Sequence, residues 1–137
     1  HISGPKKIKN LNNLVTKEYP NFPTDLQAQF MVLLCKAKGK SSITESIFEN
    51  RFMHVAELRR LGAEIIVKKN KAHISGNTNF QAAELMSSDL RASVALVLAA
   101  IVAKGSSIIN RIYHLDRGYE NIENKLRKVG VNIRRVN

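Results

Sequence analysis

The chain has 137 residues, of which 44% are hydrophobic, enough for a single domain with a buried core. Lysine and arginine number 22 against 11 for aspartate and glutamate, an excess that favours anionic partners. One cysteine excludes an internal disulfide framework and predicts a reducing, cytoplasmic setting. The longest apolar run, residues 92–103, is shorter than the roughly 20 residues that cross a bilayer, so we expect no membrane partner.

The tetrapeptide HISG opens the chain and returns at residues 73–76. The second copy ends the segment IIVKKNKAHISG, in which apolar and polar residues alternate around an Asn-Lys turn, a pattern typical of a β-hairpin. We therefore interpret the first copy as part of a strand. Because the chain begins without methionine, we expect it to be part of a longer protein.

Two similar series of elements follow one another along the chain. In the first series we expect helices over 26–37 and 53–61 and strands over 41–48 and 63–69. In the second we expect helices over 92–103 and 119–128 and strands over 106–114 and 131–136. Corresponding residues lie a nearly constant distance apart, with 64 positions from Asp25 to Asp89 and 68 from Gly62 to Gly130. The sequence therefore contains an internal repeat.

The order of strands and helices predicts an α/β fold with parallel crossovers. We expect two βαβαββ units, with unit one at residues 1–72 and unit two at residues 73–137. Because the helices over 26–37 and 92–103 are nearly all apolar, we expect them to be buried, with the sheets packed around them. Two units would leave part of such an interior open, so we expect an incomplete domain, the C-terminal part of a larger one.

The loops that follow the strands are the expected place for chemistry, because free N–H groups at the start of the next helix attract anions. Asp25 and Arg51 lie in two such loops of unit one. Asp89, Arg91 and Arg117 lie in the matching loops of unit two. The residues of each unit should share a face. The planar guanidinium of arginine is suited to binding carboxylate or phosphate there.

Two interpretations of Asp25 stay open. It follows two prolines, which would hold its carboxylate in place as a general base, but an acid in the first turn of a helix also stabilises that helix. Thr24 and Gln27 have the spacing of a capping box. For Asp89 the helix-stabilising role is favoured, with Arg91 as an expected partner. Cys35 lies among apolar residues and is expected to be buried and unreactive, and the spacing of the histidines predicts no metal site.

Four segments of the chain closely resemble the enolpyruvyl transferases, specifically the C-terminal third of those that act on UDP-N-acetylglucosamine. They are YPNFPTDLQAQF, TESIFENRFMHVAELRRLGA, SSDLRAS and RIYHLDRGYENIENKLRKVG, in the family's order. The similarity runs from about Tyr19 to Val136. It implies an inside-out α/β barrel, which is built of βαβαββ units with their helices buried inside.

The resemblance implies transfer of the enolpyruvyl group from phosphoenolpyruvate to the 3-hydroxyl of UDP-N-acetylglucosamine with release of phosphate, without a cofactor. This would be the first committed step of bacterial peptidoglycan synthesis, which supports cell shape and division. By analogy, Asp25 is the base facing that hydroxyl and Ile47 contacts the sugar nucleotide. Arg91 and Arg117 hold the phosphoenolpyruvate carboxylate, and Arg51 supports the anionic site. Secondary candidates for substrate binding are Phe48, Asp89 and Leu90.

The family's reactive cysteine and a lysine that binds phosphoenolpyruvate lie in N-terminal parts that these residues do not match, and Cys35 is not that cysteine. We therefore expect these residues to need the N-terminal portion of the same protein as a partner, and to give no turnover alone. A 5-enolpyruvylshikimate-3-phosphate synthase-like transferase is an alternative. An alternative of another class is a basic nucleic-acid-binding module, which rests on charge alone, and we expect no nucleic acid partner.

Overall fold

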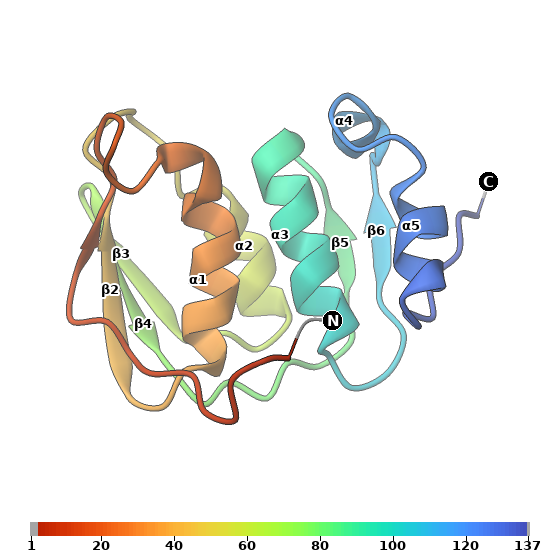
Figure 1. The fold of residues 1–137 in the computed structure, drawn as a ribbon, viewed down its shortest axis with the longest axis horizontal. Coiled ribbons are helices and arrows are strands. Elements are labelled where there is room, and N and C mark those ends of the chain that lie inside the picture. Colours follow the sequence, from red (N-terminus) through yellow and green to blue (C-terminus); the bar gives the residue numbers. More distant parts are fainter. Residues whose placement is uncertain (1–2, 137) are drawn as a thin grey trace.

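A computed structural model describes residues 3–136 as two β-sheets with helices between them (Figure 1). His1 and Ile2 of the first HISG lie outside the described residues, and Ser3 and Gly4 do not form the expected strand. The elements in chain order are β1 (Leu14–Val15), the 3-10 helix η1 (Thr24–Leu26), α1 (Gln27–Lys36), β2 (Lys40–Thr44), α2 (His54–Arg60), β3 (Ile65–Lys68), β4 (Lys71–Ser75), β5 (Glu84–Met86), α3 (Leu90–Ile101), β6 (Ile108–Asn110), α4 (Tyr113–Asp116) and α5 (Ile122–Lys128).

The first sheet has the strand order β1-β2-β4-β3. β1 pairs with β2 in parallel, and β4 pairs antiparallel with both β2 and β3. β2 and β3 therefore run in the same direction, with the return strand β4 between them. α1 and α2 are the crossovers, as the order of elements predicts. The expected hairpin joins β3 to β4, and Lys69 in its turn has a φ of 53°.

The second sheet consists of β5 and β6, which are parallel and joined by α3. This crossover was also expected. The second HISG segment lies in β4 and the residue that follows it, within the first sheet. That sheet therefore extends past residue 72, and the second sheet begins at Glu84. The predicted helix ends at Gly62 and Gly130 are confirmed, and both glycines have a left-handed φ, of 95° and 94°.

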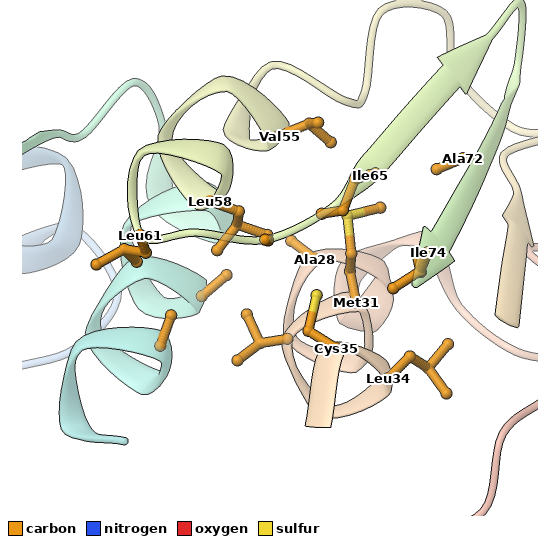
Figure 2. Close-up of a cluster of buried hydrophobic side chains, with 14 of the residues drawn as sticks. Ala28, Met31, Leu34, Cys35, Val55, Leu58, Leu61, Ile65, Ala72 and Ile74 are labelled. Atoms are coloured by element: carbon orange, nitrogen blue, oxygen red, sulfur yellow. The ribbon is translucent and has the colours of Figure 1, made fainter. Parts of the chain in front are cut away.

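The core lies where α1 and α2 face the β3–β4 hairpin (Figure 2). Met31 of α1, Leu58 of α2 and Ile74 of β4 are 0%, 0% and 1% exposed. Leu96 of α3 belongs to the same cluster, so α1 and α3 are largely buried, as their composition predicts. A second, smaller cluster joins α3 to α5 beside the second sheet.

Four local predictions are wrong. The strand expected over 41–48 ends at Thr44, where its pairing with β4 stops. Residues 131–136 form no strand, because no partner strand accompanies them as β4 accompanies β3. The strand expected over 106–114 ends at Asn110, since Arg111 takes a φ of 57° and the chain then turns into α4. The capping box is not formed, because the Thr24 hydroxyl donates to Glu45 at 2.9 Å.

Gly76 marks a close approach of two chain segments. Its N–H donates to the Gly39 carbonyl at 2.9 Å, and a Cβ atom at position 76 would overlap the carbonyl oxygens of Ala37 and Gly39. We expect Gly76→Ala to lower the free energy of unfolding by about 1–3 kcal/mol, measured by urea denaturation. Gly4→Ala is the control, because nothing lies within 4 Å of the added carbon. Equal urea midpoints for the two variants would contradict this account of Gly76.

Candidate functional site

A cavity of about 320 Å³ is lined by residues at the starts of α1, α2 and α3. These helix starts lie at the upper edge of the molecule in Figure 1. Its wall carries two arginines and several other polar side chains. The polar lining residues include Thr24, Gln27, Arg51, His54, Asp89 and Arg91. The cavity therefore lies at the helix starts that follow the strands, which is where the sequence predicts chemistry.

Asp25 and Arg91 form an ion pair at this cavity. The Nε and Nη2 atoms of Arg91 each lie 2.5 Å from Oδ1 of Asp25. The two residues come from the two halves of the repeat, and their side chains are 65% and 38% exposed. The faces that carry the predicted residues of the two units therefore meet, a fact that spacing alone could not establish.

The Asp89 carboxylate forms hydrogen bonds with the backbone at the start of α3. Its carboxylate accepts hydrogen bonds from the N–H groups of Arg91 and Ala92, at 2.9 and 3.0 Å, so it caps the start of α3. Burial raises the pKa of Asp89, but these hydrogen bonds and one from Ser88 outweigh it, so the pKa lies below 3.8. The helix-stabilising role is confirmed. Arg91 is a partner of Asp89 through its backbone N–H, whereas its guanidinium pairs with Asp25.

Arg51 lines the same cavity, and its guanidinium carbon lies 4.5 Å from the centre of the Phe48 ring. Phe48 is 52% exposed, so this stacking holds Arg51 at the surface of the cavity. Ile47 lines a separate cleft beside Lys17.

The remaining predicted residues lie on or after α3. Leu90, in the first turn of α3, lies against Gly118. A Cβ atom added to Gly118 would lie 2.8 Å from Cδ2 of Leu90. Arg117 caps the C-terminal end of α4 and is exposed. It is not among the residues that line the cavity. The structure thus brings Asp25, Arg51, Asp89 and Arg91 together, with Ile47 and Arg117 outside this group.

Glu45 is a site residue that sequence reasoning missed. Its side chain is buried, with 2% of the residue exposed. Oε1 accepts hydrogen bonds from the Thr16 hydroxyl and from the N–H groups of Ile47 and Phe48, at 2.8, 2.9 and 3.2 Å. Oε2 accepts one from the hydroxyl of Thr24, the residue before Asp25. One carboxylate therefore fixes both loops that carry predicted substrate contacts, and the available signal was an acid at the strand exit.

His54 is a second missed residue. It is 4% exposed and lines the cavity beside Asp89. Burial lowers the pKa of His54 from 6.5 to about 4, although the Asp89 charge opposes this shift. The imidazole is therefore neutral at pH 7. A histidine in an amphipathic helix pattern gives little signal of such a position.

The prediction for Cys35 is confirmed. The residue is 0% exposed, and burial raises the pKa of its thiol to about 12, so it carries no thiolate at neutral pH. Within residues 3–136, no cluster of three or more His, Cys, Asp and Glu side chains is placed to hold a metal ion. No helix in this range is long and apolar enough to cross a membrane.

The sequence and the fold of the chain both match a known class of proteins. Residues 2–126 match the family described as EPSP synthase (3-phosphoshikimate 1-carboxyvinyltransferase). The chain belongs to this family. In solved structures, it is similar to the enolpyruvyl transferase NikO from Streptomyces tendae, with a TM-score of 0.86 and 28% identity, over 95% of this chain and 30% of that one. An EPSP synthase from Acinetobacter baumannii shares the fold, with a TM-score of 0.66 and 15% identity, over 93% of this chain and 28% of that one.

Three curated relatives of higher identity share one name. The chain is 68% identical over 136 residues to the UDP-N-acetylglucosamine 1-carboxyvinyltransferase of Pelagibacter ubique, covering 99% of this chain and 32% of the relative. It is 59% identical to the enzyme of that name from Campylobacter hominis, covering 98% of this chain and 32% of the relative. For the Helicobacter pylori enzyme of that name (strain 26695) the identity is 55%, over 96% of this chain and 31% of the relative. The chain thus spans about a third of the length of these relatives.

The Glu45 carboxylate should be needed for folding as well as for loop position. We expect Glu45→Leu to lower the free energy of unfolding by about 2–4 kcal/mol, because two N–H groups and two hydroxyls lose their acceptor. Glu45→Gln keeps one oxygen and should cost less. Glu64→Leu is the control, because Glu64 is exposed. Urea denaturation measures all three, and equal stability of Glu45→Leu and Glu64→Leu would refute the role given to Glu45.

The buried His54 predicts a pH dependence of stability. The unfolded chain takes up a proton near pH 6.5, whereas the folded chain takes it up near pH 4. The free energy of unfolding should therefore fall as the pH drops from 6.5 to 4, by at most about 3 kcal/mol. His54→Phe should remove this part of the slope. The measurement is a urea titration at several pH values, and parallel curves for the two proteins would show that His54 is not the cause.

Proposed function

We propose that these residues form part of an enzyme that transfers the enolpyruvyl group of phosphoenolpyruvate to the 3-hydroxyl of UDP-N-acetylglucosamine and releases phosphate. The observation that carries the proposal is the contact of Asp25 with Arg91, which lines a cavity together with Arg51. It sets a carboxylate that can accept a proton beside guanidinium groups that can bind an anion. Relatives with 55–68% identity bear the name of this activity, which supports the choice of substrates.

In this proposal Asp25 accepts the proton of the sugar hydroxyl as that oxygen bonds to the enolpyruvyl group. Arg91, with Arg117, binds the carboxylate of phosphoenolpyruvate, and Arg51, resting on Phe48, supports the anionic site. Ile47 contacts the sugar nucleotide. The cleft beside Ile47 is connected to the Asp25 loop, because Glu45 accepts hydrogen bonds from both Ile47 and Thr24.

The roles of Asp89 and Leu90 in this proposal are indirect. Asp89 holds the first turn of α3, so it sets the backbone from which the Arg91 side chain reaches the cavity. Leu90 packs against Gly118, next to Arg117, which connects the start of α3 with the end of α4. Asp89 therefore acts through Arg91, and Leu90 acts through Arg117.

We propose further that the two sheets belong to an inside-out α/β barrel. Apolar side chains on the central helices that remain exposed support this, with Leu33 of α1 at 41%, Leu98 of α3 at 39% and Val102, just after α3, at 48%. In a barrel of this kind, further helices would cover these side chains. The reaction would belong to cytoplasmic synthesis of cell-wall precursors, and thereby to cell shape and division, and the single buried thiol suits that setting.

The acceptor of a 5-enolpyruvylshikimate-3-phosphate synthase is the main competing substrate, because the family takes its description from that enzyme. The similarity to the solved EPSP synthase supports the fold alone, because the sequence identity is only 15%. Calorimetry with each acceptor, on an enzyme that spans the full length of the relatives and carries these residues, distinguishes the two. Heat of binding with the shikimate phosphate and none with UDP-N-acetylglucosamine would favour the competing substrate.

The role of Asp25 gives a direct test. In the full-length enzyme we expect Asp25→Asn to lower kcat about 100-fold or more, because the hydroxyl loses its proton acceptor. Binding of phosphoenolpyruvate should be kept or tightened, because Arg91 loses its internal partner. Glu123→Gln is the matched control, since Glu123 also pairs with an arginine, Arg135, and neither residue lines the cavity. A phosphate-release assay gives kcat, and an unchanged value for Asp25→Asn would remove Asp25 from the mechanism.

A further inference from the structure

Two side chains that line the cavity each carry a buried nitrogen atom without a hydrogen-bond partner. These nitrogens are Nε2 of Gln27, in the first turn of α1, and Nε2 of His54, at the start of α2. Gln27 is 2% exposed and His54 is 4% exposed, and both residues line the cavity together with Arg51 and Arg91. Within residues 3–136, nothing satisfies either nitrogen.

Unpartnered buried polar atoms are rare, because such a group loses its hydrogen bonds to water and gains none in return. Because both side chains line the same cavity, a group bound there is a candidate partner for the two nitrogens. The cavity has room for such a group, with a volume of about 320 Å³. That group is either ordered water or a ligand.

The internal repeat favours a ligand. The segments TDLQA and SDLRA are equivalent in the two halves of the chain, so Gln27 occupies the position that Arg91 has in the second half. Both side chains line the same cavity from the first turns of neighbouring helices. α1 and α3 contact each other directly, through the central core. The position that supplies a cationic anion-binding group in one half supplies a neutral amide in the other.

The chemistry of the two groups complements that of the arginines. The amide of Gln27 is neutral, and burial keeps the imidazole of His54 neutral at pH 7 because its pKa lies at about 4. Arginines attract any small anion. Neutral donors that are fixed in a buried wall instead stabilise a ligand that has an oxygen atom at one particular position. A ligand with oxygens at both ends, such as a carboxylate that also carries a phosphate ester, can contact the arginines and the neutral pair together.

We propose that Gln27 and His54 are further ligand-binding residues, which donate hydrogen bonds through their Nε2 atoms to an oxygen of a small carboxylated phosphate ester bound between α1, α2 and α3. This inference rests on the proposed function, for which phosphoenolpyruvate is that ester. The neutral pair makes the cavity selective for such an ester over a simple anion.

The test uses an enzyme that spans the full length of the relatives and carries these residues. Gln27→Met replaces the amide with an apolar group of similar length, so the buried unpartnered nitrogen disappears. We expect the melting temperature to stay the same or rise, while the Kd for phosphoenolpyruvate, measured by calorimetry, weakens about tenfold for the lost hydrogen bond. Binding of inorganic phosphate should change less, because phosphate alone can stay on the arginines.

Gln29→Met is the matched control. Gln29 is in the same helix and also carries a buried oxygen without a partner, but it does not line the cavity. We expect its phosphoenolpyruvate Kd to match the parent value. For His54, we expect His54→Phe to weaken binding and His54→Gln, which can place an amide nitrogen near the position of Nε2, to retain most of it.

The outcomes separate the two proposals. If the parent enzyme neither binds phosphoenolpyruvate nor turns over, the proposed function fails. If the parent binds it and Gln27→Met and His54→Phe bind it equally well, the proposed function stands and this inference is overturned, with water as the occupant of the wall. A lower melting temperature for Gln27→Met, with a binding loss of the same size in Gln29→Met, would also overturn it, because both would then report packing alone.

Discussion

The packing of α1 against α3 is the contact on which the site depends. Each helix is too apolar to lie on a surface, so each must be covered on more than one side, and the two cover one another between the sheets (Figure 1). Because the helices run side by side and both begin at the same edge, the residues before and in their first turns meet. Asp25 and Arg91 lie 66 residues apart in the sequence and touch for this reason.

Three acidic side chains at or near the cavity have separate tasks, which follow from how deeply each is buried. Glu45 is buried and gives its lone pairs to loop N–H groups and hydroxyls, so it fixes the shape of the loops. Asp89 is partly buried and gives its lone pairs to the start of α3. Asp25 is mostly exposed and has an arginine as its partner. Of the three carboxylates, Asp25 is thus the one that can exchange its partner without disturbing backbone hydrogen bonds.

The sequence could predict what depends on local pattern. The crossovers, the helix ends at Gly62 and Gly130 and the buried, unreactive Cys35 follow from periodicity, turn chemistry and composition. The role of Glu45 could not be predicted, because its inward direction depends on Thr16 and Thr24, which are brought near by tertiary contacts. The absence of a strand over 131–136 has the same origin, since strand formation needs a neighbouring strand that local pattern does not supply.

The exposure of the Asp25–Arg91 pair bears on how a ligand could enter. An ion pair at this degree of exposure contributes about 0–1 kcal/mol to stability, since water and salt screen it. Both Arg91 nitrogens converge on one oxygen of Asp25, whereas a ligand carboxylate can take them in the parallel, two-oxygen geometry that guanidinium groups prefer. A bound anion can therefore displace Asp25 at small cost. In the proposed function, the displaced carboxylate would then be free beside the ligand, so binding of the anion would also free Asp25 to act as the base.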